Sequence, residues 1–291
     1  MILEEEKKIS RLAIPLKERQ GKGAAFWGKC AAFLKRDWIE NTSYASAFLM
    51  DFAGIAAQLA TFYFISKMIE NGSGSFADYR SSYFAFVLIG IAFSSYQAAS
   101  LHSFTGALMR EMEGGTLEAI LATPTSPAAV MIAGSLWSFL FTSVRVAIYL
   151  FFGFLFGIDF SRANFFAAGI LMILTITSLS GIGILSAGIA LLLKKGDPVV
   201  FLMNGMSKLF AGVYFPLSIL PSWAQSFSQL IPLTHSLEGM RKALLNGAGL
   251  QAVSKEIAVL SAFSLFFIPV ALVCFRSAVG KAQRDGALGF R

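Results

Sequence analysis

Charged residues are scarce in this sequence. Asp, Glu, Lys and Arg make up 14% of its 291 residues, while hydrophobic residues make up 56%. A soluble chain of this size would alternate apolar stripes with charged faces along its elements. Here the charges lie mostly between long apolar runs, so the composition excludes an ordinary soluble domain.

Cysteine and histidine are also rare, with two of each. Cys30 and Cys274 lie too far apart in sequence for a disulfide framework, and the two His residues add no spacing that would hold a metal. We therefore expect free thiols and no metal site. A membrane-embedded enzyme finds no support, because no His/Asp or Ser/Lys pattern accompanies His102 and His235, which fall on opposite expected sides of the membrane; we expect no catalytic residue.

Long apolar runs fill most of the chain. Each run has about 19 residues or more, and a helix needs roughly 20 residues to cross a hydrocarbon core of ~30 Å. Backbone polar groups must be satisfied inside the bilayer, so spans of this length are expected to be helices. The sequence predicts an all-α, polytopic membrane protein with six transmembrane helices, at residues 43–66, 81–106, 128–157, 165–193, 199–220 and 257–275.

Lys and Arg are distributed unevenly between the connections. Sixteen lie in the segments on the side of the two termini, and six lie in the alternate segments. Such an excess marks the cytoplasmic side, so both termini are expected in the cytoplasm and the protein in the inner membrane. The expected organisation is a cytoplasmic segment at 1–42, without a cleavable signal peptide, a transmembrane domain at 43–276 and a cytoplasmic tail at 277–291.

The amino-terminal segment contains a helical pattern from Ala24 to Glu40. Trp rings suit a helix that lies in the membrane interface; the alternative is a helix packed on another cytoplasmic element. Residues 23–30 also have the spacing of a phosphate-binding loop, but Cys30 replaces the Ser or Thr that would bind magnesium. We expect no nucleotide there. The predicted interfacial face carries Trp27, Ala31, Leu34 and Trp38, and the opposite face carries Lys29, Arg36 and Glu40.

The connection before the last run, residues 221–256, is long and apolar. Proline residues divide it into pieces that predict two short helices, Ser222–Ile231 and Leu237–Leu245. Ser236 is a plausible N-cap, and Asn246 with Gly247 a plausible stop. Helices this short cannot cross the bilayer, so they are expected to be re-entrant or to lie in the outer leaflet. They would form a structural lid or contact substrate.

Acidic residues mark the connection at 107–127. Glu111, Glu113 and Glu118 lie on a predicted short helix that ends at Pro124 and Pro127. A negative segment on the inner side runs against the usual positive charge there. We interpret this segment as a docking surface.

Ionisable residues inside apolar runs are costly and often functional. Asp51 and Lys208 each fall roughly 12 to 15 Å from the cytoplasmic side at ~1.5 Å per residue, whereas Arg145 falls nearer the outer leaflet. The depths predict a pair between Asp51 and Lys208, either orienting two helices or leaving Lys208 to attract an anionic part of a cargo. An ion-coupled secondary transporter using Asp51, His102 and Lys208 is the alternative function.

Three segments resemble a known family. Residues 113–126, residues 213–221 and residues 231–235 are similar to the permease subunits of type-2 ABC exporters, which transport polysaccharides, lipid-linked glycans and drugs. The resemblance covers roughly residues 24–280. It implies half of a translocation pathway, completed by a second permease copy in a homodimer, and an amphipathic cargo. It also implies that a separate ABC-type ATPase subunit binds ATP and magnesium, so this chain itself would be no enzyme and would bind no cofactor or nucleic acid.

The resemblance further implies roles for particular residues. The first, second and fifth spans would line the pathway, which makes the first and fifth neighbours. The implied pathway residues are Asp51, Lys208, Tyr214, Phe215 and Pro216. The residues implied to receive the motion of the ATPase are Glu111, Glu113, Gly115, Thr116, Leu117, Glu118, Trp27 and Lys35.

Overall fold

The computed structural model describes residues 22–42, 45–70, 83–115, 127–193 and 198–284. Regular structure in these ranges is entirely helical, which confirms the all-α prediction. The helices are α2 (Lys22–Thr42), α3 (Ala45–Glu70), α4 (Tyr83–Glu113), α6 (Pro127–Leu155), α7 (Phe165–Leu193), α8 (Pro198–Phe210), the short 3-10 helix η1 (Leu217–Ile219), α9 (Ser222–Ser228), α10 (Pro232–Leu245) and α11 (Ser254–Arg284).

Five helices of the described ranges are long and apolar enough to cross a membrane: α3, α4, α6, α7 and α11. The expected fifth span at 199–220 is wrong in length, because α8 has 13 residues. At ~1.5 Å per residue such a helix extends roughly 20 Å, short of a ~30 Å core. It stops where Gly212 adopts a φ of 73°, a left-handed conformation that commonly ends helices.

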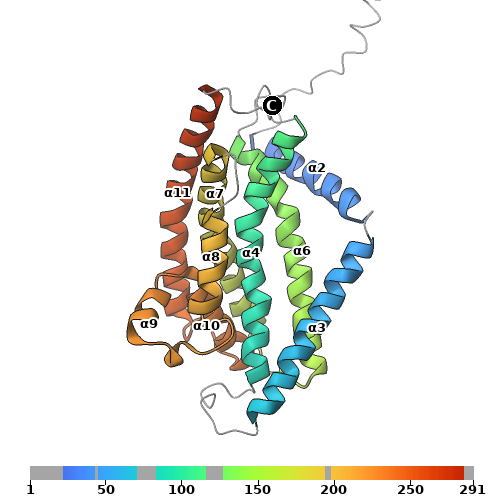
Figure 1. The fold of residues 1–291 in the computed structure, drawn as a ribbon, viewed down its shortest axis with the longest axis vertical. Helices are drawn as coiled ribbons and strands as arrows, with labels where there is room; N and C mark the ends of the chain where they lie inside the picture. The colour runs from blue at the N-terminus through green and yellow to red at the C-terminus, as the bar shows by residue number, and fades with distance from the viewer. Residues whose placement is uncertain (1–21, 43–44, 71–82, 116–126, 194–197, 285–291) are drawn as a thin grey trace, which may run out of the picture.

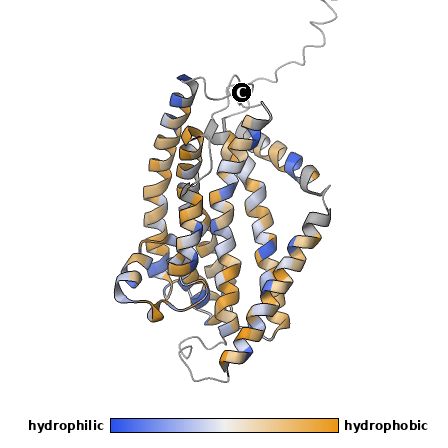
Figure 2. Ribbon diagram, in the orientation of Figure 1, coloured by the Kyte–Doolittle hydropathy of each residue, from blue (hydrophilic) through white to orange (hydrophobic). Residues whose placement is uncertain are grey.

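Large apolar side chains cover the outside of the bundle. Phe201 is 83% exposed, Leu265 77% and Phe154 65%. Figure 2 shows mostly hydrophobic colours along α3 and α11. An apolar surface of this extent suits contact with lipid or another membrane-embedded chain, which agrees with the predicted multi-pass membrane protein.

Helix α4 forms the centre of the bundle. Its apolar residues are mostly buried, and α6 and α7 pack against it while α11 packs against α7 (Figure 1). Close approach to α7 requires a glycine, since a Cβ at Gly183 would lie 2.1 Å from the carbonyl oxygen of Ser100. Helix α2 lies at one end of the bundle, and α9 and α10 lie at the other (Figure 1). These are called the α2 end and the α10 end below.

The two short helices are confirmed, with one error at a helix start. Helix α10 begins at Pro232, whose missing N–H suits the first helical position. Ser236 is therefore not an N-cap; it is buried within the helix, and its hydroxyl shares a 2.6 Å hydrogen bond with Thr175 of α7. The expected stop is confirmed, with Asn246 as C-cap and Gly247 at a φ of 68°.

The amino-terminal helix is present as α2, which includes residues 23–30. Cys30 and Asp37, two turns apart, are buried, whereas Ala31 and Trp38 are exposed. Trp38 makes an edge contact with Trp137 of α6 at 5.5 Å between ring centroids. The helix is thus packed on the bundle along a face that the apolar periodicity did not indicate. Both thiols are free, as expected.

Candidate functional site

An open groove of about 640 Å³ lies between α4 and α8. Its volume falls within the ~300–1,000 Å³ that small-molecule sites occupy. The groove is lined by His102, Thr105 and Gly106 from α4 and by Val200, Phe201, Asn204, Gly205 and Lys208 from α8. Its walls are mainly apolar, with a few polar groups.

The two walls are joined by a polar contact. The Asn204 amide lies within hydrogen-bond distance of His102 Nε2, at 3.2 Å. A second link lies nearby, where the buried Gln97 donates from Nε2 to the backbone oxygen of Met203 at 3.1 Å. These bonds set the position of α8 against α4 and so define the width of the groove.

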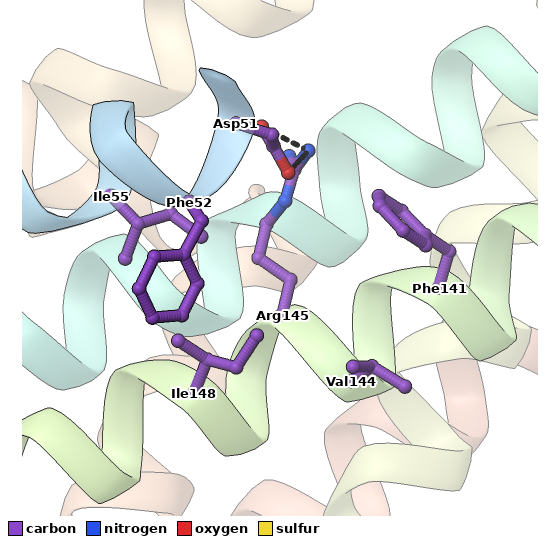
Figure 3. A pocket seen from close by; sticks show the side chains of 7 residues that line it. All are labelled: Asp51, Phe52, Ile55, Phe141, Val144, Arg145 and Ile148. Atoms are coloured by element: carbon purple, nitrogen blue, oxygen red, sulfur yellow. Dashed lines mark hydrogen bonds and ion pairs between the residues drawn. The ribbon is translucent and has the colours of Figure 1, made fainter. Parts of the chain in front are cut away.

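Lys208 and Asp51 do not form the expected pair. The Nη2 atom of Arg145 on α6 donates to both carboxylate oxygens of Asp51, at 2.7 and 2.6 Å (Figure 3). Lys208 is exposed on α8 and makes no ion pair with the residues whose positions are described. The alternative of an ion-coupled secondary transporter needs Asp51, His102 and Lys208 in one site. The structure places Asp51 at a different cavity from the groove that His102 and Lys208 line.

The wrong pairing has a geometric cause. Counting depth from the start of each run assumes that all helices begin in one plane. Figure 1 instead shows α3 beginning level with the middle part of α6, after α2 has run obliquely away from the α2 end of the bundle. Asp51, near the start of α3, therefore lies level with Arg145. Figure 3 shows the ion pair beside Phe52, Phe141 and Ile148 around a cavity of about 10 Å³, too small for a cargo molecule.

The segment after α8 holds the predicted pathway residues Tyr214, Phe215 and Pro216. Tyr214 stacks on Phe62 of α3, with ring centroids 5.6 Å apart and an interplanar angle of 12°. Phe215 is partly buried and Pro216 is buried at the start of η1. The structure thus brings Tyr214 against the first span, while Lys208 faces the groove.

Arg241 of α10 fixes this break in the chain, and the sequence analysis missed it. The guanidinium is buried, lies 3.5 Å from the ring centroid of Phe86, and donates from Nη2 to the Gly212 oxygen at 2.8 Å and the Phe86 oxygen at 3.2 Å. It satisfies carbonyl groups just beyond the end of α8, which would otherwise lack partners. The sequence carries no local signal for this role, because Glu238 and Lys242 lie beside Arg241 in the same helix and make it look like an ordinary surface cation.

A second missed contact joins α2 to the end of α4. Arg36 donates from Nη1 to Glu111 Oε1 at 2.8 Å and from Nε to Asp37 Oδ1 at 3.1 Å. Burial alone would lower the pKa of Arg36, but its hydrogen bonds to the Glu111 and Asp37 carboxylates and their negative charges raise the pKa above its usual value. Arg36 therefore stays charged at any physiological pH. We call these three residues the α2–α4 joint.

The joint corrects the reading of Glu111. Glu111 is 7% exposed as a residue and is bonded to Arg36, so it is not part of an exposed acidic surface. Helix α4 also continues to Glu113, further than the expected boundary at 107. Lys35 is exposed on α2, and Gly115 follows α4 with a φ of 66°. Thr116, Leu117 and Glu118 lie outside the described residues, as do the side chains of Trp27 and Glu113.

The fold and the groove together define a class: a helical, multi-pass membrane protein with a ligand-sized groove between two of its helices. Comparison with known proteins identifies the family within that class. Residues 29–245 match the ABC-2 type transporter family, and the chain belongs to it. It is therefore a permease subunit of the ABC-2 type.

Two curated relatives share a 179-residue segment with this chain. Both are named inner membrane transport permease YhhJ, one from Escherichia coli (strain K12) and one from Shigella flexneri, and each is 28% identical over that segment. The segment covers 60% of this chain and 47% of each relative. The chain thus spans about half the length of the curated relatives it matches.

Proposed function

We propose that this chain is the transmembrane subunit of an ATP-driven exporter. In this proposal it forms half of the translocation pathway, a second copy of the chain forms the other half, and a separate ABC-type ATPase subunit binds ATP with magnesium. Membership of the ABC-2 type transporter family supports the proposal. The observation that carries it is the α2–α4 joint.

The joint supports coupling because it ties α2 to the end of α4, which residues 114–126 follow in the chain. Arg36 of α2 binds Glu111, two residues before α4 ends at Glu113. A subunit that pushes on α2 or on residues 114–126 would thereby move α4, whose far half is buried at the centre of the bundle. Glu113 and Glu118 are proposed as the charged contacts of the ATPase. The α2 end would then face the cytoplasm, with both termini, and the bilayer would be the inner membrane.

The groove between α4 and α8 is proposed as part of the pathway. Its open side, with Phe201 83% exposed, would face the second copy across a twofold axis. The stack of Tyr214 on Phe62 would close the pathway towards the α10 end when no cargo is bound. Helices α3, α4 and α8 would therefore enclose the cargo.

Copurification with an ATPase tests the proposal. The full chain is coexpressed with a candidate ABC-type ATPase subunit, purified through a tag on the permease, and assayed for magnesium-dependent ATP hydrolysis. We expect a stable complex and expect the double variant Glu113→Lys with Glu118→Lys to lose the ATPase, since two repulsive contacts replace two attractive ones. The matched control is Asp159→Lys, which changes an exposed carboxylate beyond the other end of α6. No ATPase bound to the folded wild-type chain would overturn the proposal.

A further inference from the structure

We propose that the groove between α4 and α8 binds the anionic headgroup of an amphiphile, with Lys208 as its cationic contact. The apolar helix walls would hold the start of the hydrocarbon part. This inference rests on the proposed function, because it names the chemical class of the cargo. It goes further than the family match, since family membership does not specify the charge of the cargo.

The charge of the groove carries the first step. None of the eight lining residues is acidic, and Lys208 is the cation among them. Asp51, the carboxylate that the sequence analysis predicted as the partner of Lys208, instead accepts hydrogen bonds from Arg145 through both of its oxygens. Among the described residues, then, the groove has a net positive charge that no protein carboxylate cancels.

Depth makes this charge significant. Lys208 lies ten residues after the start of α8 and His102 eleven residues before the end of α4. At ~1.5 Å per residue each lies roughly 15 Å from that end of its own helix, inside an apolar run. An ammonium inside an apolar run is costly without a partner, so Lys208 needs an anion or hydration. An open groove supplies room for either.

A purely structural role for Lys208 is already filled by another residue. Lys208 lies in the last turn of α8, where a cation interacts favourably with the helix dipole. Arg241, however, is bonded to the Gly212 carbonyl and approaches the Val213 carbonyl at 3.5 Å, both just past that helix end. Lys208 is exposed to the groove. Within the described part of the chain it donates no hydrogen bond to these carbonyl groups.

The shape of the groove favours an amphiphile over a small anion. Val200 and Phe201 extend the walls by roughly 10 Å along α8 from Lys208. Gly106 on α4 and Gly205 on α8 line the groove and leave open space in it, because a Cβ on either would meet no atom within 4 Å. A free phosphate would need only the polar end, whereas an acyl or prenyl chain would also cover the apolar wall.

Binding of a fluorescent phosphatidic acid to the purified full chain in dodecyl maltoside tests the inference. We expect Lys208→Gln to weaken binding on the order of tenfold, since one charged hydrogen bond is lost. Lys208→Arg should keep the affinity within about threefold, because the charge remains. Gly205→Phe should block binding by filling the groove. Fluorescent phosphatidylcholine should bind more weakly to the wild type and should be insensitive to Lys208→Gln.

The controls separate this inference from its alternatives. Arg276→Gln removes the same charge from an exposed position on α11 and should leave the affinity unchanged. Equal binding of the two lipids, or full affinity in Lys208→Gln and Gly205→Phe, would overturn the inference. If inorganic phosphate at the same concentration as the lipid prevented lipid binding, the groove would be a site for a free anion and the amphiphile would be ruled out. The assay needs no ATPase, so its failure is distinct from a failure of copurification, which would overturn the proposed function alone.

Discussion

Arg145 and Asp51 join the middle of α6 to the start of α3 through a single guanidinium nitrogen that donates to both carboxylate oxygens, at 2.7 and 2.6 Å. The pair matters because α3 is among the least buried of the long helices. Phe141 adds a cation–π contact, with its ring centroid 5.6 Å from Arg145 Cζ. The pair is therefore the main polar link that holds this stretch of α3 to the bundle.

Breaking the pair one residue at a time should cost more than removing both. Asp51→Asn leaves Arg145 without its anion, and Arg145→Met leaves Asp51 without its cation. We expect each single change to lower stability by roughly 1–3 kcal/mol, between values for exposed and buried pairs, since about a third of each side chain is exposed. The double variant should recover most of the loss. Melting temperatures of the four proteins in detergent form the cycle, and additive losses would contradict the link.

Close packing of α4 against the break after α8 predicts a large effect at Gly90. A Cβ there would lie 2.1 Å from the backbone oxygen of Val213 and 2.9 Å from Arg241 Nη2. Gly90→Ala should therefore destabilise the fold by roughly 3 kcal/mol, because backbone has to move. Gly54→Ala is the matched control, since its Cβ meets no atom within 4 Å and alanine favours the helix. Equal melting temperatures for the two variants would show that Arg241 and Val213 do not pack as described.

Charge reversal tests the α2–α4 joint. Arg36→Glu or Glu111→Arg alone should release α2 from α4, which hydrogen exchange of the α2 amides would report as faster exchange. The combined reversal should restore protection, because the ion pair is re-formed with opposite polarity. The expected loss is roughly 1 kcal/mol, since Arg36 is 45% exposed. Lys35→Glu, an exposed neighbour, is the control; equal exchange in Lys35→Glu and Arg36→Glu would remove the joint from the account.

The aromatic stack between Tyr214 and Phe62 predicts a role in closing the pathway. Tyr214→Ala removes the ring that bridges α3 and the segment after α8. We expect vesicles that contain this variant to leak a small fluorescent dye faster than wild-type vesicles without ATP. Ile219→Ala, an exposed apolar residue on η1, gives the comparison. Dye retention equal to that of the wild type would make Tyr214 ordinary packing.

Much of the fold follows from the sequence because apolar runs specify membrane helices locally. The starts of α4, α6 and α7 agree with the expected runs within two residues. The length of α8 did not follow, since the apolar run continues to Leu220 and Pro216 favoured a break there, whereas the helix already ends at Phe210. Its end depends on the conformation of Gly212 and on the distant Arg241. Contacts between remote elements carry no signal in local periodicity.

The candidate site was predicted in part. Lys208, which the sequence analysis singled out as an ionisable residue inside an apolar run, lies in the groove together with His102. The partner of Asp51 was wrong because helix depth depends on the tilt of α2, which residue counting ignores. Glu111 was misread because an acidic residue at the end of a helix looks the same whether it faces solvent or, as here, Arg36.

The most direct test of the central claim is ATP-dependent export from reconstituted vesicles. The full permease and its ATPase subunit are inserted into phosphatidylcholine vesicles that contain a fluorescent phosphatidic acid, and the fluorescence of lipid in the leaflet opposite the ATPase is followed by quenching. We predict that magnesium and ATP will raise the rate of transfer to that leaflet several-fold, and that Lys208→Gln will lower this increase. The account would be contradicted if ATP left the rate of lipid transfer unchanged although the complex was intact and hydrolysed ATP in the presence of the lipid.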